Sequence, residues 1–197
     1  MDHLEQIKQL QRKIRQLQEE LITDELTRVL NRRGLMERID PFINEVRYQM
    51  ENPDQRRGMV IRNFSLVFVD VDKFKAINDS HGHAAGDSVL IEVAQRLRDN
   101  VRGSDIVGRY GGEEIVIGLL GANRTDAQAV AENLRQKVAE SPFTHNGTGI
   151  TVTASFGVAA LEKNMSTSEL IDVADKALYR AKEGGRNRVE IAALPAS

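Results

Sequence analysis

The sequence of 197 residues contains no cysteine and no tryptophan, only four prolines, and no long run of apolar residues. Without cysteine the chain can form neither disulfides nor thiolate metal sites, which fits a reducing compartment. No stretch approaches the roughly 18–20 apolar residues that span a bilayer. The N-terminus carries acidic and amide residues where a signal peptide has an apolar core. We therefore expect a cytoplasmic protein with no membrane segment in this chain.

Neither sign of charge is in excess. The chain has 27 Lys and Arg against 29 Asp and Glu, a formal net charge of -2. This balance lacks the basic surface that nucleic-acid binding requires, so we expect no nucleic-acid partner. Apolar residues make up 41% of the chain, which is enough for a sizeable core. The length fits one domain plus an appended element.

The first 22 residues contain neither glycine nor proline and differ in composition from the rest. Their apolar residues follow steps of three and four, the spacing of a heptad seam: Ile7, Leu10, Ile14, Leu17 and Leu21. Isoleucine at a and leucine at d favours a parallel two-stranded coiled coil. The alternative is a helix packed on its own domain, but the narrow apolar stripe favours the coil. We predict a dimerising coiled-coil helix at 1–22 and a second domain at 23–197.

Beyond residue 23 the sequence alternates between helix and strand patterns. Residues 31–50 predict an amphipathic helix disturbed by Pro41, residues 51–63 a polar loop, and the apolar run Leu66–Val71 a buried central strand. Further helices are expected near 73–80, 87–101, 125–140 and 167–183, strands at 150–160 and 187–192, and a hairpin that turns at Gly111-Gly112. The order predicts an α/β domain with a five-stranded mixed central sheet flanked by helices.

Two places put carboxylates where core residues are expected. Asp70 and Asp72 end the strand Leu66–Val71 and project to the same face, while Glu113 and Glu114 follow the predicted turn. Buried unpaired carboxylates are costly, so such clusters normally bind a cation. Oxygen ligands without His or Cys suit Mg²⁺ or Mn²⁺, and Mg²⁺ commonly bridges carboxylates to substrate phosphates. The competing interpretation is two exposed acidic strand ends.

Five blocks of this sequence resemble, in order, the motifs of the GGDEF family of diguanylate cyclases. RYGGEEIVI resembles the signature hairpin in a GGEE form, here GGEEI; the other blocks are DELTRVLNRRG (24–34), FVDVDKFKAINDSHGHAAGD (68–87), TASFGVA (153–159) and DVADKALYRAKEGGRNRV (172–189). A lone GGEE tetrapeptide is weak evidence, whereas five ordered blocks are specific. The resemblance implies a nucleotidyl cyclase fold related to the polymerase palm. It also implies condensation of two GTP into cyclic di-GMP, with release of two pyrophosphates.

The resemblance assigns the acidic positions to catalysis and metal binding. Asp70 and Glu113 resemble the Mg²⁺ carboxylates, with the backbone carbonyl of Val71 as a further ligand. Glu114 resembles the second acidic residue, which is either a metal ligand or the base that eases removal of the ribose 3′-OH proton. Both roles remain open for Glu114. The implied cofactor is Mg²⁺, or Mn²⁺ in its place.

The resemblance also assigns GTP binding. Asn78 and Asp87 match the guanine-reading pair, and a carboxylate can accept from guanine N1–H and the 2-amino group, which adenine lacks. By the same resemblance, Gly112 lies where the nucleotide approaches closely. The triphosphate-binding cations correspond to Lys75, Lys182 and Arg186, and the phosphate cradle to the backbone N–H groups of Lys73 and Phe74. The alternative for Lys182 and Arg186 is an ordinary solvated helix end. The sequence has no GxxxxGK[ST], so a P-loop is not the phosphate site.

Three positions need separate comment. Ile115 stands where the family signature usually has Phe, and we expect it to be a packing position. His81 and His83 lie beside the expected guanine site. For both we favour structural hydrogen bonding over metal binding, because a hard cation prefers oxygen.

Arg102 and Asp105 form an R-x-x-D sequence, with five residues between Asp105 and Gly111. This spacing matches the family's inhibitory site for cyclic di-GMP. Guanidinium can bond guanine O6 and N7, and the carboxylate can accept from N1–H and the amino group. The alternative is a surface Arg–Asp pair that closes a helix.

Each domain is expected to hold one GTP, so catalysis requires two domains face to face as a homodimer. Two rival functions stay in view. One is an inactive GGDEF domain that only binds cyclic di-GMP, which intact positions 70 and 111–114 disfavour. The other is a cyclase with an adenine-containing product, which Asn78 and Asp87 disfavour.

Overall fold

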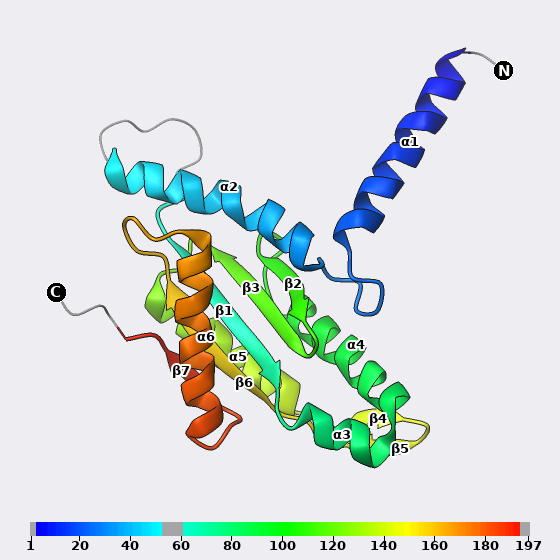
Figure 1. Ribbon diagram of the computed structural model, residues 1–197, viewed down its shortest axis with the longest axis vertical. Coiled ribbons are helices and arrows are strands. Elements are labelled where there is room, and N and C mark those ends of the chain that lie inside the picture. Colours follow the sequence, from blue (N-terminus) through cyan, green and yellow to red (C-terminus); the bar gives the residue numbers. More distant parts are fainter. Residues whose placement is uncertain (1–2, 53–60, 194–197) are drawn as a thin grey trace.

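A five-stranded sheet forms the centre of the protein, whose computed structural model describes residues 3–52 and 61–193 (Figure 1). The strand order is β2-β3-β1-β6-β7, with bounds Ile106–Gly111, Glu114–Leu120, Phe64–Val71, Ala154–Ala160 and Val189–Ile191. β1 is antiparallel to both β3 and β6, β2 is antiparallel to β3, and β6 is parallel to β7. The mixed five-stranded sheet that the sequence predicts is therefore confirmed.

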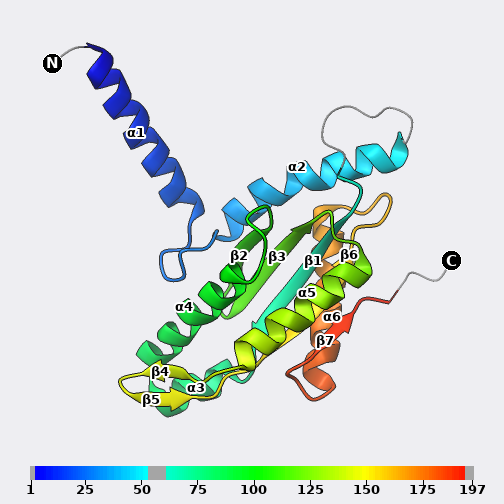
Figure 2. The ribbon, with the colours of Figure 1, turned by 180° about the vertical axis from the view of Figure 1, so that it is seen from behind.

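Helices cover both faces of this sheet. One face carries α2 (Arg32–Glu51) and α6 (Thr167–Glu183), as Figure 1 shows; the other carries α4 (His83–Asp99) and α5 (Arg124–Ala139), as Figure 2 shows. All residues of β1 are buried, and they alternate between two hydrophobic clusters, one on each face. The predicted central strand is thus confirmed, and its even-numbered side chains face α2 and α6.

A second, two-stranded sheet corrects the predicted strand at 150–160. Residues 143–150 form a hairpin, β4 (Phe143–His145) with β5 (Thr148–Ile150), and the central strand β6 begins only at Ala154. The hairpin turns at Asn146 and Gly147, which both have positive φ, the conformation of a tight two-residue turn. The buried side chains of Phe143 and Ile150 pack this hairpin against the hydrophobic core.

The helix boundaries also differ from those predicted. Gly82, with φ of 83°, separates α3 (Phe74–His81) from α4, which therefore begins four residues earlier than expected. Helix α2 continues without a break through Pro41, which is exposed. Of the predicted loop at 51–63, residues 53–60 lie outside the described residues.

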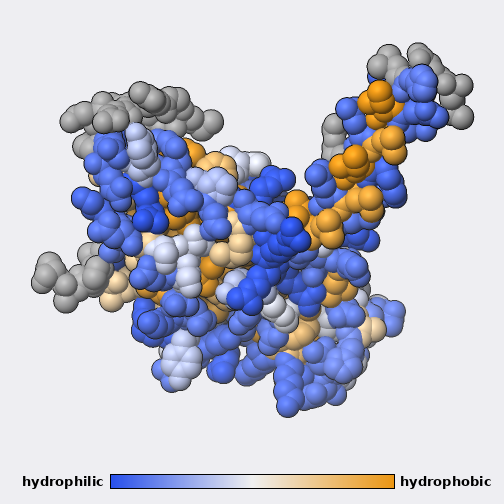
Figure 3. Space-filling view, turned by 45° about the horizontal axis from the view of Figure 1, so that its top comes forward, coloured by the Kyte–Doolittle hydropathy of each residue, from blue (hydrophilic) through white to orange (hydrophobic). Residues whose placement is uncertain are grey.

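Helix α1 (His3–Ile22) projects away from the rest of the chain in Figures 1 and 2. Its apolar seam, residues 7, 10, 14, 17 and 21, is 46–63% exposed, and Figure 3 shows it as an apolar stripe along α1. The helix therefore does not bury its stripe on its own domain, which contradicts the alternative to the coil. Within the described ranges, no helix combines the length and the apolarity needed to cross a bilayer.

Candidate active site

The carboxylate of Asp70 lies at the end of β1, between two neighbouring strands. The register places it opposite Glu114 on β3 and opposite Ser155 on β6. Asp70 is 6% exposed, and its side chain points to the α6 face, where Lys182 Nζ lies 2.7 Å from Asp70 Oδ2. Lys182 belongs to the last turn of α6. The ordinary solvated helix end considered for Lys182 is therefore not what the structure shows.

Burial raises the pKa of Asp70, even though the hydrogen bond and charge of Lys182 lower it; the nearby Glu113 and Asp72 raise it further. Burial also raises the pKa of Glu114, and the charge of Asp70 adds to this effect. Both carboxyls therefore resist ionisation in the folded chain. This is the electrostatic state that a bound cation would relieve.

The turn between β2 and β3 consists of Gly112 and Glu113. Gly112 has φ of 45°, and a Cβ built there would meet no protein atom within 4 Å. Glycine is favoured at this position because of the positive φ, not because a side chain would clash with the protein, and the space beside it is open. Glu113 is half-buried. The turn therefore holds Glu113 next to Glu114 at the same end of the sheet as Asp70.

The donor chemistry of this cluster fits a hard cation, because every candidate ligand is an oxygen. Among the described residues, no three His, Cys, Asp or Glu side chains converge as they would around a metal ion. The ammonium of Lys182 is the cation that balances Asp70 here. The groups that could hold an ion here are the side chains of Asp70, Glu113 and Glu114 and the Val71 carbonyl.

Asp72 shares the face of Asp70 but has a different environment. Its carboxylate accepts hydrogen bonds from Thr153 Oγ1 and Ser155 Oγ, both at 2.6 Å, and from the Asn187 backbone N–H at 2.9 Å. It is 6% exposed. The two buried aspartates predicted from the sequence therefore differ in their partners. Three protein groups donate hydrogen bonds to Asp72, whereas the charge of Asp70 is balanced by Lys182.

The expected phosphate site lies around the start of α3. Lys73 has φ of 55° and stands directly before this helix, which has no side-chain cap within the described chain. The first N–H groups of an uncapped helix lack internal acceptors and suit an anion. A cavity of about 530 Å³ opens beside them and is lined by Lys73 and Arg186, among other residues. Lys75 is exposed on α3 and does not line this cavity.

The expected guanine-reading residues lie on adjacent helices. Asn78 belongs to α3 and is half-buried, and Asp87 belongs to α4 and is exposed. A Cβ on Gly86 would lie 1.9 Å from Asn78 Oδ1, so the glycine lets the amide pack directly against α4. The structure thus places Asn78 against the residue that precedes Asp87.

The predicted packing role of Ile115 is confirmed, because this residue is 1% exposed in the core. His81 and His83 are exposed, and the hydrogen bonds predicted for them are not found in the described part of the chain. In the R-x-x-D segment, Asp105 accepts from the backbone N–H groups of Arg102 at 2.9 Å and Leu120 at 3.2 Å. Arg102 itself is exposed.

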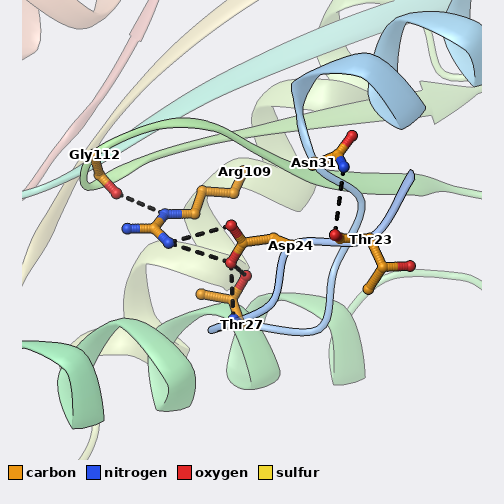
Figure 4. A network of polar contacts seen from close by, with 6 residues as sticks. All are labelled: Thr23, Asp24, Thr27, Asn31, Arg109 and Gly112. Atoms are coloured by element: carbon orange, nitrogen blue, oxygen red, sulfur yellow. Dashed lines mark hydrogen bonds and ion pairs between the residues drawn. The ribbon is translucent and has the colours of Figure 1, made fainter. Parts of the chain in front are cut away.

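The polar network that fixes the turn at Gly112 and Glu113 was not predicted from the sequence (Figure 4). Arg109 donates from Nε to the Gly112 carbonyl at 2.8 Å and from Nη1 to both oxygens of Asp24, at 3.2 and 3.3 Å. Burial raises the pKa of Asp24, but hydrogen bonds from Thr27 and the charge of Arg109 outweigh it, so the pKa lies below its usual value. Two sequence features could have indicated this network: Arg109, two residues before Gly111, and the segment DELT at residues 24–27.

The same network begins where α1 ends. Asn31 donates from Nδ2 to the backbone carbonyls of Leu21 at 2.9 Å and Thr23 at 3.3 Å, and its Oδ1 caps α2. The backbone between α1 and α2 is therefore hydrogen-bonded to both helices. Through Asp24 and Arg109 it is also connected to the turn that carries Glu113.

An α/β sheet with acidic residues at one end, an uncapped helix and adjacent cations defines a domain suited to a phosphorylated ligand and a cation. Residues 21–188 match the family model described as diguanylate cyclase, GGDEF domain. The chain therefore belongs to the GGDEF family.

Curated relatives carry diguanylate cyclase names. DosC of Escherichia coli is 41% identical over 169 residues, which cover 85% of this chain and 34% of DosC. DgcP of Pseudomonas aeruginosa is 37% identical over 171 residues, which cover 87% of this chain and 24% of DgcP. The matched part thus spans about a quarter to a third of the length of these relatives.

Solved structures share the fold. The coiled coil and GGDEF domain of DgcB from Caulobacter crescentus, in complex with c-di-GMP, matches with a TM-score of 0.85 at 26% identity, over 96% of this chain and 95% of that chain. SiaD from Pseudomonas aeruginosa matches with a TM-score of 0.78 at 33% identity, over 95% and 68% of the two chains.

The raised pKa of Glu114 predicts a stabilising substitution. Its ionised form lowers the free energy of unfolding at neutral pH, because folding disfavours that charge. Metal-free Glu114→Gln should therefore melt above the wild type at pH 7. The difference should close as the pH falls toward about 4, where the wild-type carboxyl takes up its proton in both states. Thermal unfolding across this pH range measures it.

Glu132→Gln is the matched control, because the hydrogen bond from Arg135 lowers the pKa of Glu132. This substitution should leave the melting temperature at pH 7 unchanged or lower it. A Glu114→Gln variant that melts at or below the wild type at pH 7 would contradict the electrostatic account of the cluster.

Proposed function

We propose that this chain is a diguanylate cyclase, which condenses two GTP into cyclic di-GMP and releases two pyrophosphates. The observation that carries this proposal is the pair of carboxyls Asp70 and Glu114, opposite each other at the end of buried strands in a GGDEF-family chain. Both carboxyls have a raised pKa, and their oxygen atoms are the kind of ligand that a metal ion bound to a triphosphate prefers.

Each acidic group has a proposed role. Asp70, Glu113 and the Val71 carbonyl hold Mg²⁺ or Mn²⁺, and Glu114 is either a further ligand or the base near the 3′-OH. The ion, when bound, neutralises the triphosphate, lowers the pKa of the hydroxyl and stabilises the leaving oxygen. The 3′-OH of one GTP attacks the α-phosphate of the other and pyrophosphate leaves. The reciprocal step then closes the ring.

The groups around the acidic cluster bind the substrate. The N–H groups of Lys73 and Phe74 receive phosphate oxygens, and Lys75, Lys182 and Arg186 supply positive charge. The Lys182 side chain is one-third exposed, so its ammonium group can leave Asp70 and bind a phosphate instead.

Guanine is read by the two helices beside this cradle. The Asp87 carboxylate accepts from N1–H and the 2-amino group, and the Asn78 amide bonds the remaining polar edge. This pair disfavours an adenine nucleotide as substrate, because adenine presents no donor at those positions.

Two chains are needed, because each domain holds one GTP. The exposed seam of α1, residues 7, 10, 14, 17 and 21, supports a parallel coiled coil between two copies. A coil raises the effective concentration of one domain near the other, and their active sites then meet face to face. The domain division at residue 22 follows from this assignment, since α1 ends there.

The rival function is an inactive receptor for cyclic di-GMP. It predicts product binding without turnover, whereas the acidic cluster and the glycine turn support an enzyme. Incubation with GTP and Mg²⁺, followed by chromatography, separates the two. We expect wild-type protein to form cyclic di-GMP and pyrophosphate, and Glu113→Gln to lose at least about 100-fold in rate while it keeps its melting temperature. No product from the wild type, or full turnover by Glu113→Gln, would contradict the proposal.

The same assay tests the coil when it is repeated across protein concentrations. Ile14→Gln with Leu17→Gln should lower the rate per chain most at low concentration, where dimers dissociate, because three heptads are marginal alone. The control is Arg12→Gln with Glu19→Gln, on the side of α1 away from the seam. Equal rates for both double variants at every concentration would remove α1 from the mechanism.

We also propose that cyclic di-GMP inhibits the enzyme at Arg102 and Asp105. Cavities on both sides of this segment include these two residues, and β2 runs directly from them to the catalytic turn. The exposed Arg102 guanidinium is available to guanine O6 and N7.

Progress curves test this site. Arg102→Ala should keep its initial rate and continue to accumulate product where the wild type slows, because the guanidinium that retains the product is gone. Lys163→Ala, which removes an exposed charge elsewhere, should slow like the wild type. If wild type and Arg102→Ala level off at the same product concentration with GTP remaining, the segment is not an inhibitory site.

A further inference from the structure

Two basic residues beside the cavity at the start of α3 have an unfavourable backbone conformation. Lys73 has φ of 55° and Arg186 has φ of 65°, and both line that cavity. Asn187, next to Arg186, has φ of 45°. Residues with a Cβ avoid the left-handed region, and they keep it only where surrounding contacts fix the backbone. Contacts from other parts of the chain must therefore fix the backbone of Arg186 and Asn187.

Asp72 supplies the first of these contacts from inside the sheet. Its Oδ2 accepts the backbone N–H of Asn187 at 2.9 Å, and its own N–H donates to the Thr153 carbonyl at 2.9 Å. The hydroxyls of Thr153 and Ser155 hold the carboxylate in place. Asp72 also directly precedes Lys73 in the chain. One buried carboxylate thus connects the strand that leads into α3 to the loop that carries Arg186.

Arg135 supplies the second contact, from the helix α5 on the other face of the sheet. Its Nη1 donates to Asn187 Oδ1 at 2.7 Å. Its Nε and Nη2 donate to the two carboxylate oxygens of Glu132, at 2.9 and 2.7 Å, so the guanidinium has a defined orientation. The Arg135 side chain is 19% exposed. Asn187 is therefore held through its backbone by Asp72 and through its side chain by Arg135.

We propose that Asp72, Asn187 and Arg135 are positioning residues for Arg186. They fix the left-handed backbone of the loop 185–187, and that backbone directs the Arg186 guanidinium toward the triphosphate. This inference rests on the proposed function, because it assigns Arg186 a triphosphate ligand. A loop ordered in advance loses little conformational freedom when the ligand binds. The network therefore acts on binding of the triphosphate, and its loss raises KM for GTP more than it changes kcat.

Two single variants remove the side-chain contact from opposite ends. Arg135→Met keeps the length of the apolar stem, and Asn187→Gly keeps a backbone that tolerates φ of 45°. Each should raise KM for GTP on the order of tenfold and leave kcat within about threefold. The double variant should be no worse than either single variant, because both remove one interaction. Asn187→Asp retains an acceptor for Arg135 but adds a negative charge, so its KM should lie below that of Asn187→Gly at high ionic strength, where the charge is screened.

Lys137→Met is the control, because it removes a cation of α5 that pairs with Glu140 and does not touch the loop; its KM should equal that of the wild type. Asn187 lies on an exposed turn, so the glycine variant keeps the test valid even if Arg135→Met does not fold. Unchanged KM in Asn187→Gly would overturn the proposal, as would a fall in kcat alone. So would additive KM increases in the double variant.

Calorimetry with Mg²⁺ and pyrophosphate separates this inference from the proposed function. Wild-type protein should bind pyrophosphate, and Asn187→Gly should bind it on the order of tenfold more weakly. If the wild type forms no cyclic di-GMP, the cyclase proposal fails, yet weaker pyrophosphate binding by the variant still supports the positioning role. Equal pyrophosphate affinity in wild type and Asn187→Gly would overturn that role whatever the reaction.

Discussion

The register of β1 against β3 is the constraint on which the site depends. It sets Asp70 opposite Glu114 where both strands leave the core, and burial raises the pKa of each carboxyl. A shift of one residue would turn Asp70 to the other face and replace the cluster by an apolar contact. Because both faces of β1 are buried, a slipped register would also bury the Asp70 carboxylate in the apolar cluster of the other face, at a desolvation cost. The fold thus brings together two carboxylates whose negative charges destabilise it. Lys182 partly balances these charges, and a bound cation would balance them further.

Two polar networks outside this cluster fix the backbone that carries the other site groups. Arg109 holds the Gly112 carbonyl and connects the turn to Asp24, close to the end of α1. Asp72 connects the start of α3 to the loop at Asn187. Each network joins segments far apart in the sequence, so the site depends on the segments around Asp24 and Asn187 as well as on the central strands. The dimer that we propose for α1 would therefore act on backbone that is connected by hydrogen bonds to the turn at Gly112 and Glu113.

Periodicity and turn chemistry predicted most of this fold. The apolar run of β1 and the apolar seam of α1 are local patterns, and both are found in the structure. The predicted hairpin is also present, but its turn consists of Gly112 and Glu113, one residue later than the predicted Gly111-Gly112. The small hairpin at 143–150 was missed, although its Asn-Gly turn is a hairpin signal, because its strands are too short to show alternation. Alternation also placed Asp72 beside Asp70 correctly. It did not show that Asp72 has three donors, because those donors are more than 80 residues away and depend on tertiary packing.

We propose that the carboxylates at the end of β1 and the start of β3 bind a divalent cation together with the triphosphate. The direct measurement is Mn²⁺ binding by electron paramagnetic resonance, with a GTP analogue whose α–β bridging oxygen is replaced by methylene. Wild-type protein with the analogue should remove Mn²⁺ from the free pool beyond what the analogue alone removes, and Asp70→Asn should not. Equal removal by wild type and Asp70→Asn would contradict the account.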